Sequence, residues 1–390
     1  MKMKSISLLV MLLTMMTQGA WAQFNVTKDD ATMNEDWNVT PGNPVTTGAT
    51  VTATYNGSKH VKSVKFVKKL RTPEVTAPIA KDGLAYTGSP IELVDAGTTT
   101  GGTMQYKVGS GTYSESIPTA TNAGTYIVYY KVVGGEAYSD VAEASISVTI
   151  AKVAATAKTN KANWAVGDII CGNGYAYTVD VNHYMPTFNS AKTAIVAYKG
   201  SATGDGTYKN GLALALTDAS DGSVWKTTKG TSDNSTKIQN ATTSESGRDI
   251  TYKQQTYGKR SDGTKESRET WIAFYNAGYI YNSSVFYPSS TTSAWFLPSI
   301  YQWNQIVKGL LGVSTNLTTS ANVALAYDRI NAKLKYAIED EQVNATALAN
   351  AAYWTASENT NDRAWCYRAN GLAGYNDKNG SLHVRPVIAF

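Results

Sequence analysis

The histidines and acidic clusters of this sequence are the first candidates for chemistry, because imidazole and carboxylate groups serve as metal ligands and general bases. His60, His183 and His383 lie far apart, and no two stand at a ligand spacing such as His-x-x-x-His. Glu339-Asp340-Glu341 offers neighbouring carboxylates, but such a run at the end of a helix usually forms a solvated surface. The sequence contains neither a spaced acidic calcium loop nor a phosphate-binding glycine loop. It therefore predicts no enzyme, no metal site and no cofactor.

Cys171 and Cys366 are the two cysteines of the chain. In an oxidising compartment two cysteines can pair, and this disulfide bond would close a long loop. Two free, buried thiols are the alternative, and the sequence leaves both open.

The end of the chain is rich in side chains that suit contact with another molecule. Between Tyr353-Trp354 and Arg385-Pro386 the sequence is dominated by Asn, Tyr, Arg, Ser and Lys, which provide contact area and adaptable hydrogen bonds. We expect Trp354, Trp365 and Arg385 to form a structural framework that holds this run outward, with Arg385 bound to backbone or to a carboxylate. The predicted ligand-binding residues are Ser357, Asn359, Asn361, Asp362, Arg363, Tyr367, Arg368, Asn370, Tyr375, Asn376, Lys378 and Asn379.

The beginning of the chain predicts export. Lys2 and Lys4 precede an apolar run, and Ala20-Trp21-Ala22 provides small residues at a cleavage site, so residues 1–22 are predicted to be a signal peptide. The apolar run is too short for a membrane span, and no later stretch is long enough. We expect a cell-surface or extracellular protein, with the periplasm as the alternative. The formal net charge of +5 gives no argument for nucleic acid, and no nucleic-acid partner is predicted.

Two β-rich regions are predicted to follow. Residues 23–75 form an N-terminal β segment, in which Asn56-Gly57 between alternating runs predicts a hairpin. Residues 76–152 contain short strand-like runs separated by Gly, Pro and Asn, which is typical of a β-sandwich. The sequence Asn122-Ala123-Gly124-Thr125-Tyr126 predicts a tyrosine corner, in which the phenol ties down a loop.

Residues 153–163 are interpreted as a linker or as the lead-in to a first strand, and residues 164–390 as a mixed α+β domain. Ser299-x-x-Gln302 is a capping box that predicts a helix ending at Gly312. A second helix is predicted around Val323 to Leu334 and a third around residues 269–281.

Longer motifs carry two family resemblances. The stretch "LAYTGSPIEL" to "NAGTYIVYYKVVG" resembles the bacterial Ig-like repeats of Bacteroidetes surface proteins. The segments "WFLPSIYQWNQIV", "RINAKL" and "YWTASENTNDRAW" to "LHVRPVIAF" are similar to the C-type-lectin-fold domain of the formylglycine-generating-enzyme type. The resemblance implies an Ig-like sandwich followed by a C-type-lectin-like domain over residues 164–390, in an exported Bacteroidetes protein.

The resemblance does not imply all the functions known for proteins similar to this domain. The Glu-Pro-Asn and Gln-Pro-Asp motifs of calcium-dependent lectins are absent, and the two cysteines do not have the arrangement of the oxidising enzymes. Some members similar to this domain are diversified by retroelements at adenine-rich codons, often for Asn. The resemblance places such variation at Asn359, Asn361, Asn370, Asn376 and Asn379, with a fixed binding loop or an ordinary surface loop as alternatives.

The sequence thus predicts an exported, adhesin-like binding protein whose C-terminal domain contacts a protein or glycan on another cell, a phage or a host surface. The alternative is a structural surface or pilus subunit that polymerises through a donated strand from residues 23–70.

Overall fold

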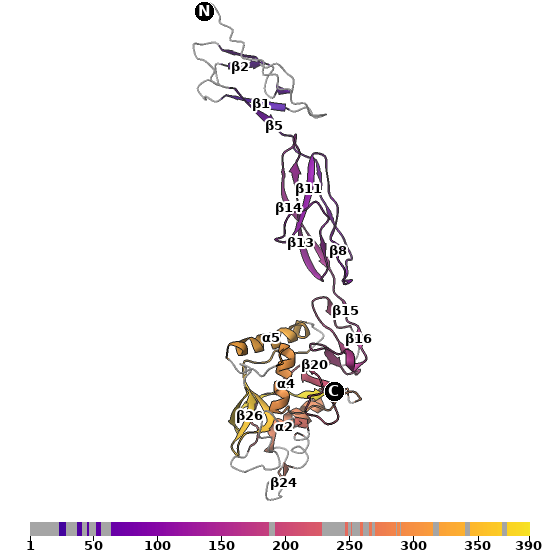
Figure 1. Ribbon diagram of the computed structural model, residues 1–390, viewed down its shortest axis with the longest axis vertical. Helices are drawn as coiled ribbons and strands as arrows, with labels where there is room; N and C mark the ends of the chain where they lie inside the picture. The colour runs from indigo at the N-terminus through magenta and orange to yellow at the C-terminus, as the bar shows by residue number, and fades with distance from the viewer. Residues whose placement is uncertain are drawn as a thin grey trace, which may run out of the picture. The chain divides into compact units, whose positions relative to one another are not determined.

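The computed structural model divides the chain into two compact units, Met1–Ala151 and Lys152–Phe390 (Figure 1). The predicted signal peptide, residues 1–22, lies outside the described residues. No helix in the described part of the chain has the length and apolar character needed to cross a membrane. The structure describes residues 70–186, 192–227, 246–248, 251, 270–285, 287–288, 290–314, 328–339, 344–368 and 373–390. It describes the backbone alone for residues 320–327 and for short strands within 23–69 and 258–266.

The N-terminal strands pair differently from the sequence prediction. β1 (Gln23–Lys28) lies between β3 (Val45–Thr46) and β5 (Val64–Lys69), and β2 (Trp37–Thr40) pairs with β4 (Thr52–Tyr55). The predicted hairpin is wrong, because its two runs form β4 and β5, and each of these pairs with an earlier strand. Alternation in a sequence indicates which residues form strands, but it does not decide which strands become neighbours.

Residues 70–151, called here the β module, form two layers around a shared core. One layer is the sheet β11-β13-β14, made of β11 (Gly102–Val108), β13 (Gly124–Gly134) and β14 (Val141–Ile150). Leu93, Val128 and Val148 are almost wholly buried in the core. The other layer consists of short antiparallel pairs: β6 (Val75–Thr76) with β10 (Thr98–Thr99), β7 (Ile79–Ala80) with β9 (Val94–Asp95), and β8 (Ile91–Glu92) with β12 (Thr119–Ala120).

The bond expected of the tyrosine corner is present in the β module. The hydroxyl of Tyr126 donates to the carbonyl oxygen of Asn122 at 2.7 Å. This bond fixes the loop that leads into β13, the central strand of its sheet. The local motif was therefore sufficient to predict this contact.

The second unit contains two larger sheets. The six-stranded sheet has the order β16-β18-β17-β20-β21-β29, and the five-stranded sheet has the order β22-β28-β25-β26-β27. Parallel β15 (Val153–Ala154) and β19 (His183–Tyr184) and antiparallel β23 (Gly258–Lys259) and β24 (Lys265–Glu266) form separate pairs. The strands of the first sheet are β16 (Ala157–Lys158), β17 (Ile169–Cys171), β18 (Ala176–Tyr177), β20 (Lys192–Lys199), β21 (Gly211–Ala215) and β29 (Val387–Ala389). Those of the second are β22 (Ser220–Ser223), β25 (Tyr353–Glu358), β26 (Arg363–Tyr367), β27 (Ala373–Asp377) and β28 (Leu382–Val384).

Residues 153–163 do not act as a linker. Val153–Ala154 and Ala157–Lys158 form β15 and β16, which pair with strands of the second unit, and a 3₁₀ turn follows at Lys161–Asn163. Of the two interpretations of this stretch, the lead-in to a first strand agrees with these pairings and the linker does not.

Helix α4 (Ile300–Leu311) connects the two sheets of the second unit, and its predicted boundaries are confirmed. Ser299 and Gln302 form the capping box, and Gly312 ends the helix with φ 67°. Its apolar face enters one core that also contains Leu212 of the six-stranded sheet and Tyr367 of the five-stranded sheet. α5 (Ser320–Glu339) lies where the second helix was predicted. The region of the third predicted helix forms three consecutive helical segments, which are α2 (Ile272–Tyr275), a π-helical segment (Asn276–Ile280) and α3 (Tyr281–Ser284).

Candidate functional site

The structure separates the predicted ligand-binding residues into three groups and leaves one undescribed. Asn359 and Asn376 are half-buried, and Asn370 lies outside the described residues. Ser357, Tyr367 and Lys378 are buried. The exposed group is Asn361, Asp362, Arg363, Arg368, Tyr375 and Asn379.

Ser357, Tyr367 and Lys378 are not contact residues, because each is used inside the fold. The hydroxyl of Ser357 accepts from the backbone N–H of Ile300 at the start of α4, at 3.0 Å. The ring of Tyr367 stacks on Trp303 of α4, with centroids 5.5 Å apart. The ammonium group of Lys378 pairs with Glu358, and both side chains are almost fully buried. These three assignments are therefore corrected.

Four residues of β26 and β27 form one continuous surface, called here the aromatic face. Arg363 stands opposite Asp377, and Trp365 stands opposite Tyr375, so all four side chains project from the same side of the hairpin. The guanidinium of Arg363 lies 5.1 Å from the ring centroid of Tyr375, and Trp365 meets that ring edge-on at 6.2 Å. Tyr375 is 47% exposed, a high value for a large aromatic side chain.

The ion pair between Arg363 and Asp377 is weak enough to leave the Arg363 guanidinium available for a ligand. Its Nε lies 3.4 Å from Asp377 Oδ1, and about half of each side chain is exposed. Exposed ion pairs of this kind contribute about 0–1 kcal/mol, so a ligand can compete for either partner at small cost. The aromatic face therefore offers a ring, a cation and an anion side by side.

Helix α4 explains why the aromatic face ends where it does. Trp303 of this helix covers Tyr353 and Tyr367 at the inner end of the same side of the sheet. Trp365 is half-buried and Arg363 is exposed, so burial decreases outward along β26. Alternation alone predicts which residues share a side of the hairpin, but not how far the helix reaches over them.

The opposite side of this sheet is sealed by a tryptophan-rich core. Trp225, Trp271 and Trp354 are fully buried there with Phe274. The indole N–H of Trp354 donates to the carbonyl oxygen of Ser223 at 2.6 Å, and that of Trp225 donates to Thr355 at 2.7 Å. Trp354 therefore has the framework position expected for it, whereas Trp365 is part of the aromatic face itself.

A buried ion pair fixes the turn after β27. Besides its pairing with Glu358, the Lys378 ammonium lies 5.0 Å from the ring centroid of Trp225. The backbone N–H of Lys378 donates to Asp362 at 2.8 Å, and its carbonyl accepts from Trp225 at 2.8 Å. The end of the β26–β27 hairpin at which Asp362 and Lys378 meet is thus held to the core.

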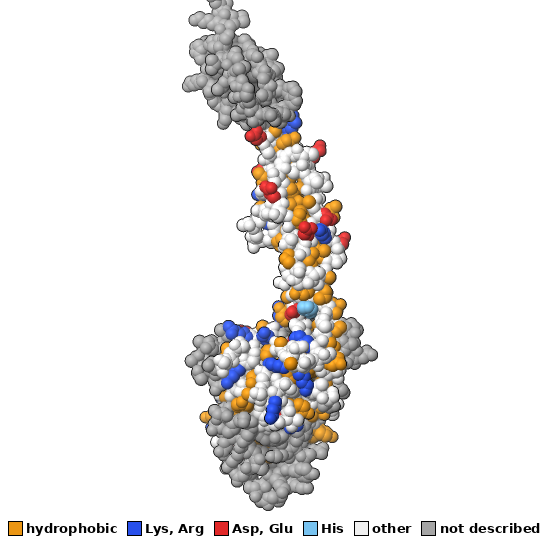
Figure 2. All heavy atoms as spheres, turned by 45° about the vertical axis from the view of Figure 1, so that its right-hand side comes forward, with side chains coloured by type: hydrophobic (Ala, Val, Ile, Leu, Met, Phe, Trp, Pro, Cys, Tyr) orange, Lys and Arg blue, Asp and Glu red, His pale blue; other side chains and the backbone are white. Residues whose placement is uncertain are grey.

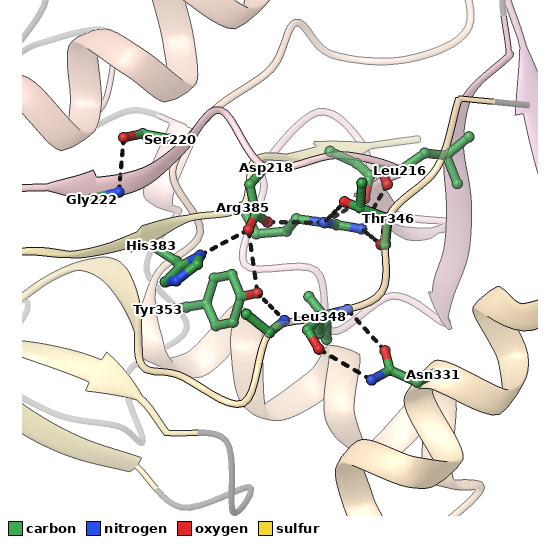
Figure 3. Close-up of polar contacts among 12 residues, drawn as sticks. Leu216, Asp218, Ser220, Gly222, Asn331, Thr346, Leu348, Tyr353, His383 and Arg385 are labelled. Atoms are coloured by element: carbon green, nitrogen blue, oxygen red, sulfur yellow. Dashed lines mark hydrogen bonds and ion pairs between the residues drawn. The ribbon is translucent and has the colours of Figure 1, made fainter. Parts of the chain in front are cut away.

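Arg385 is the centre of a second buried network, shown in Figure 3. Its guanidinium donates to the carbonyl oxygens of Ala215, Leu216 and Thr346, each at 2.8 Å. It also donates to Asp218 Oδ1 at 2.9 Å and to the Thr346 hydroxyl at 3.1 Å. Arg385 thus connects the end of β21 to the segment that precedes β25.

Asp218 extends this network towards β25 and β28. Its Oδ2 lies 3.0 Å from His383 Nδ1 and 3.4 Å from the hydroxyl of Tyr353, which in turn accepts from the N–H of Ala349. Burial raises the pKa of Tyr353 well above its usual range, so the phenol stays protonated. An acid, an imidazole and a phenol do meet here, but their bonds hold strands together. No local motif indicated Asp218 or Tyr353, because these contacts join residues more than 130 positions apart.

The two cysteines are free and buried, which agrees with the second of the two alternatives that the sequence left open. Cys171 belongs to β17 in the core beneath the six-stranded sheet, and Cys366 belongs to β26 in the tryptophan-rich core. Burial raises the pKa of the Cys171 thiol to about 12 and also raises that of Cys366. Both groups behave as small apolar side chains rather than as reactive thiols.

We expect neither thiol to react with a soluble disulfide reagent at pH 8 while the chain is folded. Both should react after unfolding, because the pKa of each thiol then returns to about 8.5 and part of it is ionised at pH 8. Titration with Ellman's reagent, with and without denaturant, measures this. A mass loss corresponding to a disulfide bond, or rapid labelling of the folded chain, would contradict the structure.

No group of three or more His, Cys, Asp or Glu side chains suited to a metal ion occurs in the described ranges. Of the three groups of residues described above, the networks around Arg385 and Lys378 are buried, whereas the aromatic face is exposed enough to meet another macromolecule.

Comparisons with known proteins add little to this geometry. No family model matches the chain, and no curated protein matches it. A crystal structure of a fimbrial protein from Bacteroides ovatus aligns over 87% of this chain and 75% of its own, with 12% sequence identity and a TM-score of 0.35. At that TM-score the similarity does not establish a shared fold.

Proposed function

We propose that the chain is an exported, modular binding protein of the cell surface, and that the aromatic face is its ligand-contact site. The observation that carries this proposal is the exposed ring of Tyr375, beside Arg363, on a hairpin that Lys378 holds to the tryptophan-rich core. Exposed aromatic and arginine side chains on a rigid support are the groups that dominate binding energy in protein interfaces. The ligand in this proposal is a protein or glycan on another cell, a phage or a host surface.

The surrounding surface supports contact with an anionic partner. Lys and Arg side chains gather on one side of the second unit (Figure 2), and Lys209, Arg329, Lys333 and Lys335 are exposed. Exposed cations of this kind would speed encounter with negatively charged glycans or cell envelopes at low ionic strength.

Diversification of the contact residues is a finer part of the proposal. Asn361 and Asn379 are exposed near the aromatic face, and Asn359 and Asn376 are half-buried. Substitution at the two exposed positions would leave the buried network around Arg385 intact. Deep sequencing of the locus tests this idea, which fails if adenine-directed changes are not concentrated in these codons.

Replacing Arg363 and Tyr375 together by alanine should abolish binding without changing the melting temperature. Each side chain is exposed, so little packing is lost, whereas a hot-spot residue costs about tenfold or more in affinity. The measurement is a glycan and protein array probed with the chain lacking residues 1–22. The matched control is Lys333→Ala with Lys335→Ala, two exposed residues of α5. Equal binding by both variants, or lower thermal stability of the first alone, would contradict the proposal.

A structural surface or pilus subunit is the second candidate. β5 pairs with β1 in the three-stranded sheet, and no other described strand pairs with it. An open strand edge can accept a strand from a neighbouring subunit. Filaments seen by electron microscopy that disappear when residues 23–69 are deleted, while array binding persists, would favour this candidate.

A further inference from the structure

We infer that two copies of this chain associate edge to edge through β14 of the β module. The order β11-β13-β14 makes β14 an outer strand of its sheet, and Figure 1 shows it along one side of the module. This inference concerns the first unit and is independent of the aromatic face.

The backbone of Ala151 shows which groups of β14 point outward. Its N–H donates to Leu84 at 2.8 Å and its carbonyl accepts from Tyr86 at 3.0 Å, so both groups point away from β13. Because backbone direction alternates along a strand, the N–H and C=O groups of Ser145, Ser147 and Thr149 point to the same side.

The contact between Thr125 and Thr149 supports this orientation. Their hydroxyls approach to 3.0 Å across β13 and β14. Such close side chains are typical of a non-hydrogen-bonded antiparallel pair, in which the backbone groups face away from the partner strand. Thr149 therefore directs its N–H and C=O to the open edge.

This open edge has a defined length. At one end Ala151 is bonded to Leu84 and Tyr86. At the other end the register with β13 shifts between Ala144 and Val141, which places a bulge on β14. No described residue bonds to the outward backbone groups of Ser145, Ser147 or Thr149.

Nothing in the sequence of this edge protects it from pairing. Residues 144–150 read Ala-Ser-Ile-Ser-Val-Thr-Ile and contain no charged residue and no proline. Natural edge strands are usually defended by lysine, proline or an inward charge. Ser145, Ser147 and Thr149 are exposed, and Ile146 is half-buried at the margin of the core. The segment is therefore suited to acquire another strand.

A second copy of the same strand can pair along the full length of this edge in one register. Antiparallel pairing centred on Ser147 places Ser147 opposite itself and Ser145 opposite Thr149 of the partner copy. These outward residues would then exchange backbone hydrogen bonds in every pair. On the inner side, Ile146 would meet Val148 of the partner copy and become covered.

Other registers of self-pairing are weaker. A centre on Ile146 pairs Ser145 with Ser147 but places Thr149 opposite the bulge at residues 141–143. A centre on Val148 pairs Ser147 with Thr149 but places Ser145 opposite Ala151, which would have to break its existing bonds. Centres on Ser145 and Thr149 meet the same two obstacles. Pairing about Ser147 opposes no like charges, because Glu143 lies outside the paired stretch and bonds Lys107 at 2.8 Å. Two-fold pairing also closes on itself, so it yields dimers rather than fibres.

Sedimentation velocity of the chain lacking residues 1–22, over a wide concentration range, tests the dimer. The wild type should shift from monomer to dimer mass as concentration rises. Ser147→Pro should stay monomeric. The N–H of Ser147 points outward, so its replacement by proline removes no hydrogen bond within the sheet. Ser147→Lys should also stay monomeric, and it replaces the proline variant if proline disturbs the fold. The control is Thr103→Lys on the outer strand β11, which should dimerise like the wild type.

Cysteine substitution tests the register. In an oxidising buffer Ser147→Cys should cross-link to itself, whereas Ser145→Cys and Thr149→Cys should cross-link when the two are mixed; the buried native cysteines would not interfere. A wild type that remains monomeric overturns the inference, even if the edge is found to bind a strand of another protein. Undiminished dimerisation of both Ser147 variants also overturns it.

Discussion

Replacing Arg385 by methionine should lower the free energy of unfolding of the second unit by about 3–5 kcal/mol. The substitution removes all the guanidinium bonds to Ala215, Leu216, Thr346 and Asp218 but retains most of the apolar stem. It leaves the Asp218 carboxylate without its guanidinium partner and the buried carbonyl oxygens without donors, and such unpaired groups are costly. Urea unfolding followed by tryptophan fluorescence measures the effect, because seven of the 9 tryptophans lie in residues 152–390.

Arg363→Met is the matched control, since it makes the same chemical change at an exposed position. We expect it to change the free energy of unfolding by no more than about 0.5 kcal/mol. Equal effects of the two substitutions would show that Arg385 does not organise the strands that support the aromatic face.

Removing one partner of the Glu358–Lys378 ion pair should be nearly as damaging. Glu358→Leu leaves the Lys378 ammonium buried beside Trp225 without its carboxylate, which costs about 3–5 kcal/mol. The double variant Glu358→Leu with Lys378→Met removes both charges and should recover much of this loss, because apolar replacements of a buried pair are often neutral. The same urea titration gives the coupling energy by a double-mutant cycle.

Additive effects of the two substitutions would contradict the buried pairing. The exposed pair Arg363–Asp377 offers a comparison within the same hairpin, with a coupling energy of at most about 1 kcal/mol. A large difference between the two cycles would show that burial, rather than charge alone, determines the effect.

Local patterns in the sequence predicted those features whose cause is local. The Ser299–Gln302 capping box and Gly312 defined α4 because cap geometry depends on a few neighbouring residues. The Tyr126–Asn122 bond was predictable for the same reason. Strand pairing was not, because the partners of β4 and β5 lie earlier in the chain, and pairing depends on the whole sheet.

The candidate site was predictable only in part. Asn361, Arg363 and Tyr375 are exposed as expected, because they lie on or beside a hairpin that extends beyond α4. Tyr367 and Lys378 have the same residue types as contact residues, but α4 and the tryptophan-rich core cover them. Residue type indicates what a side chain can bind, whereas tertiary packing decides whether it is accessible. The sequence could not decide whether the two cysteines pair for the same reason, since their positions in two separate cores depend on tertiary packing.

Site-specific photo-cross-linking at position 375 tests the proposed contact site most directly. A benzophenone amino acid in place of Tyr375 should form a covalent adduct with the ligand that the array identifies. The same group in place of Tyr279, whose exposure is similar at 44%, should not. Cross-linking from position 279 but not from position 375 would contradict the assignment of the aromatic face as the binding surface.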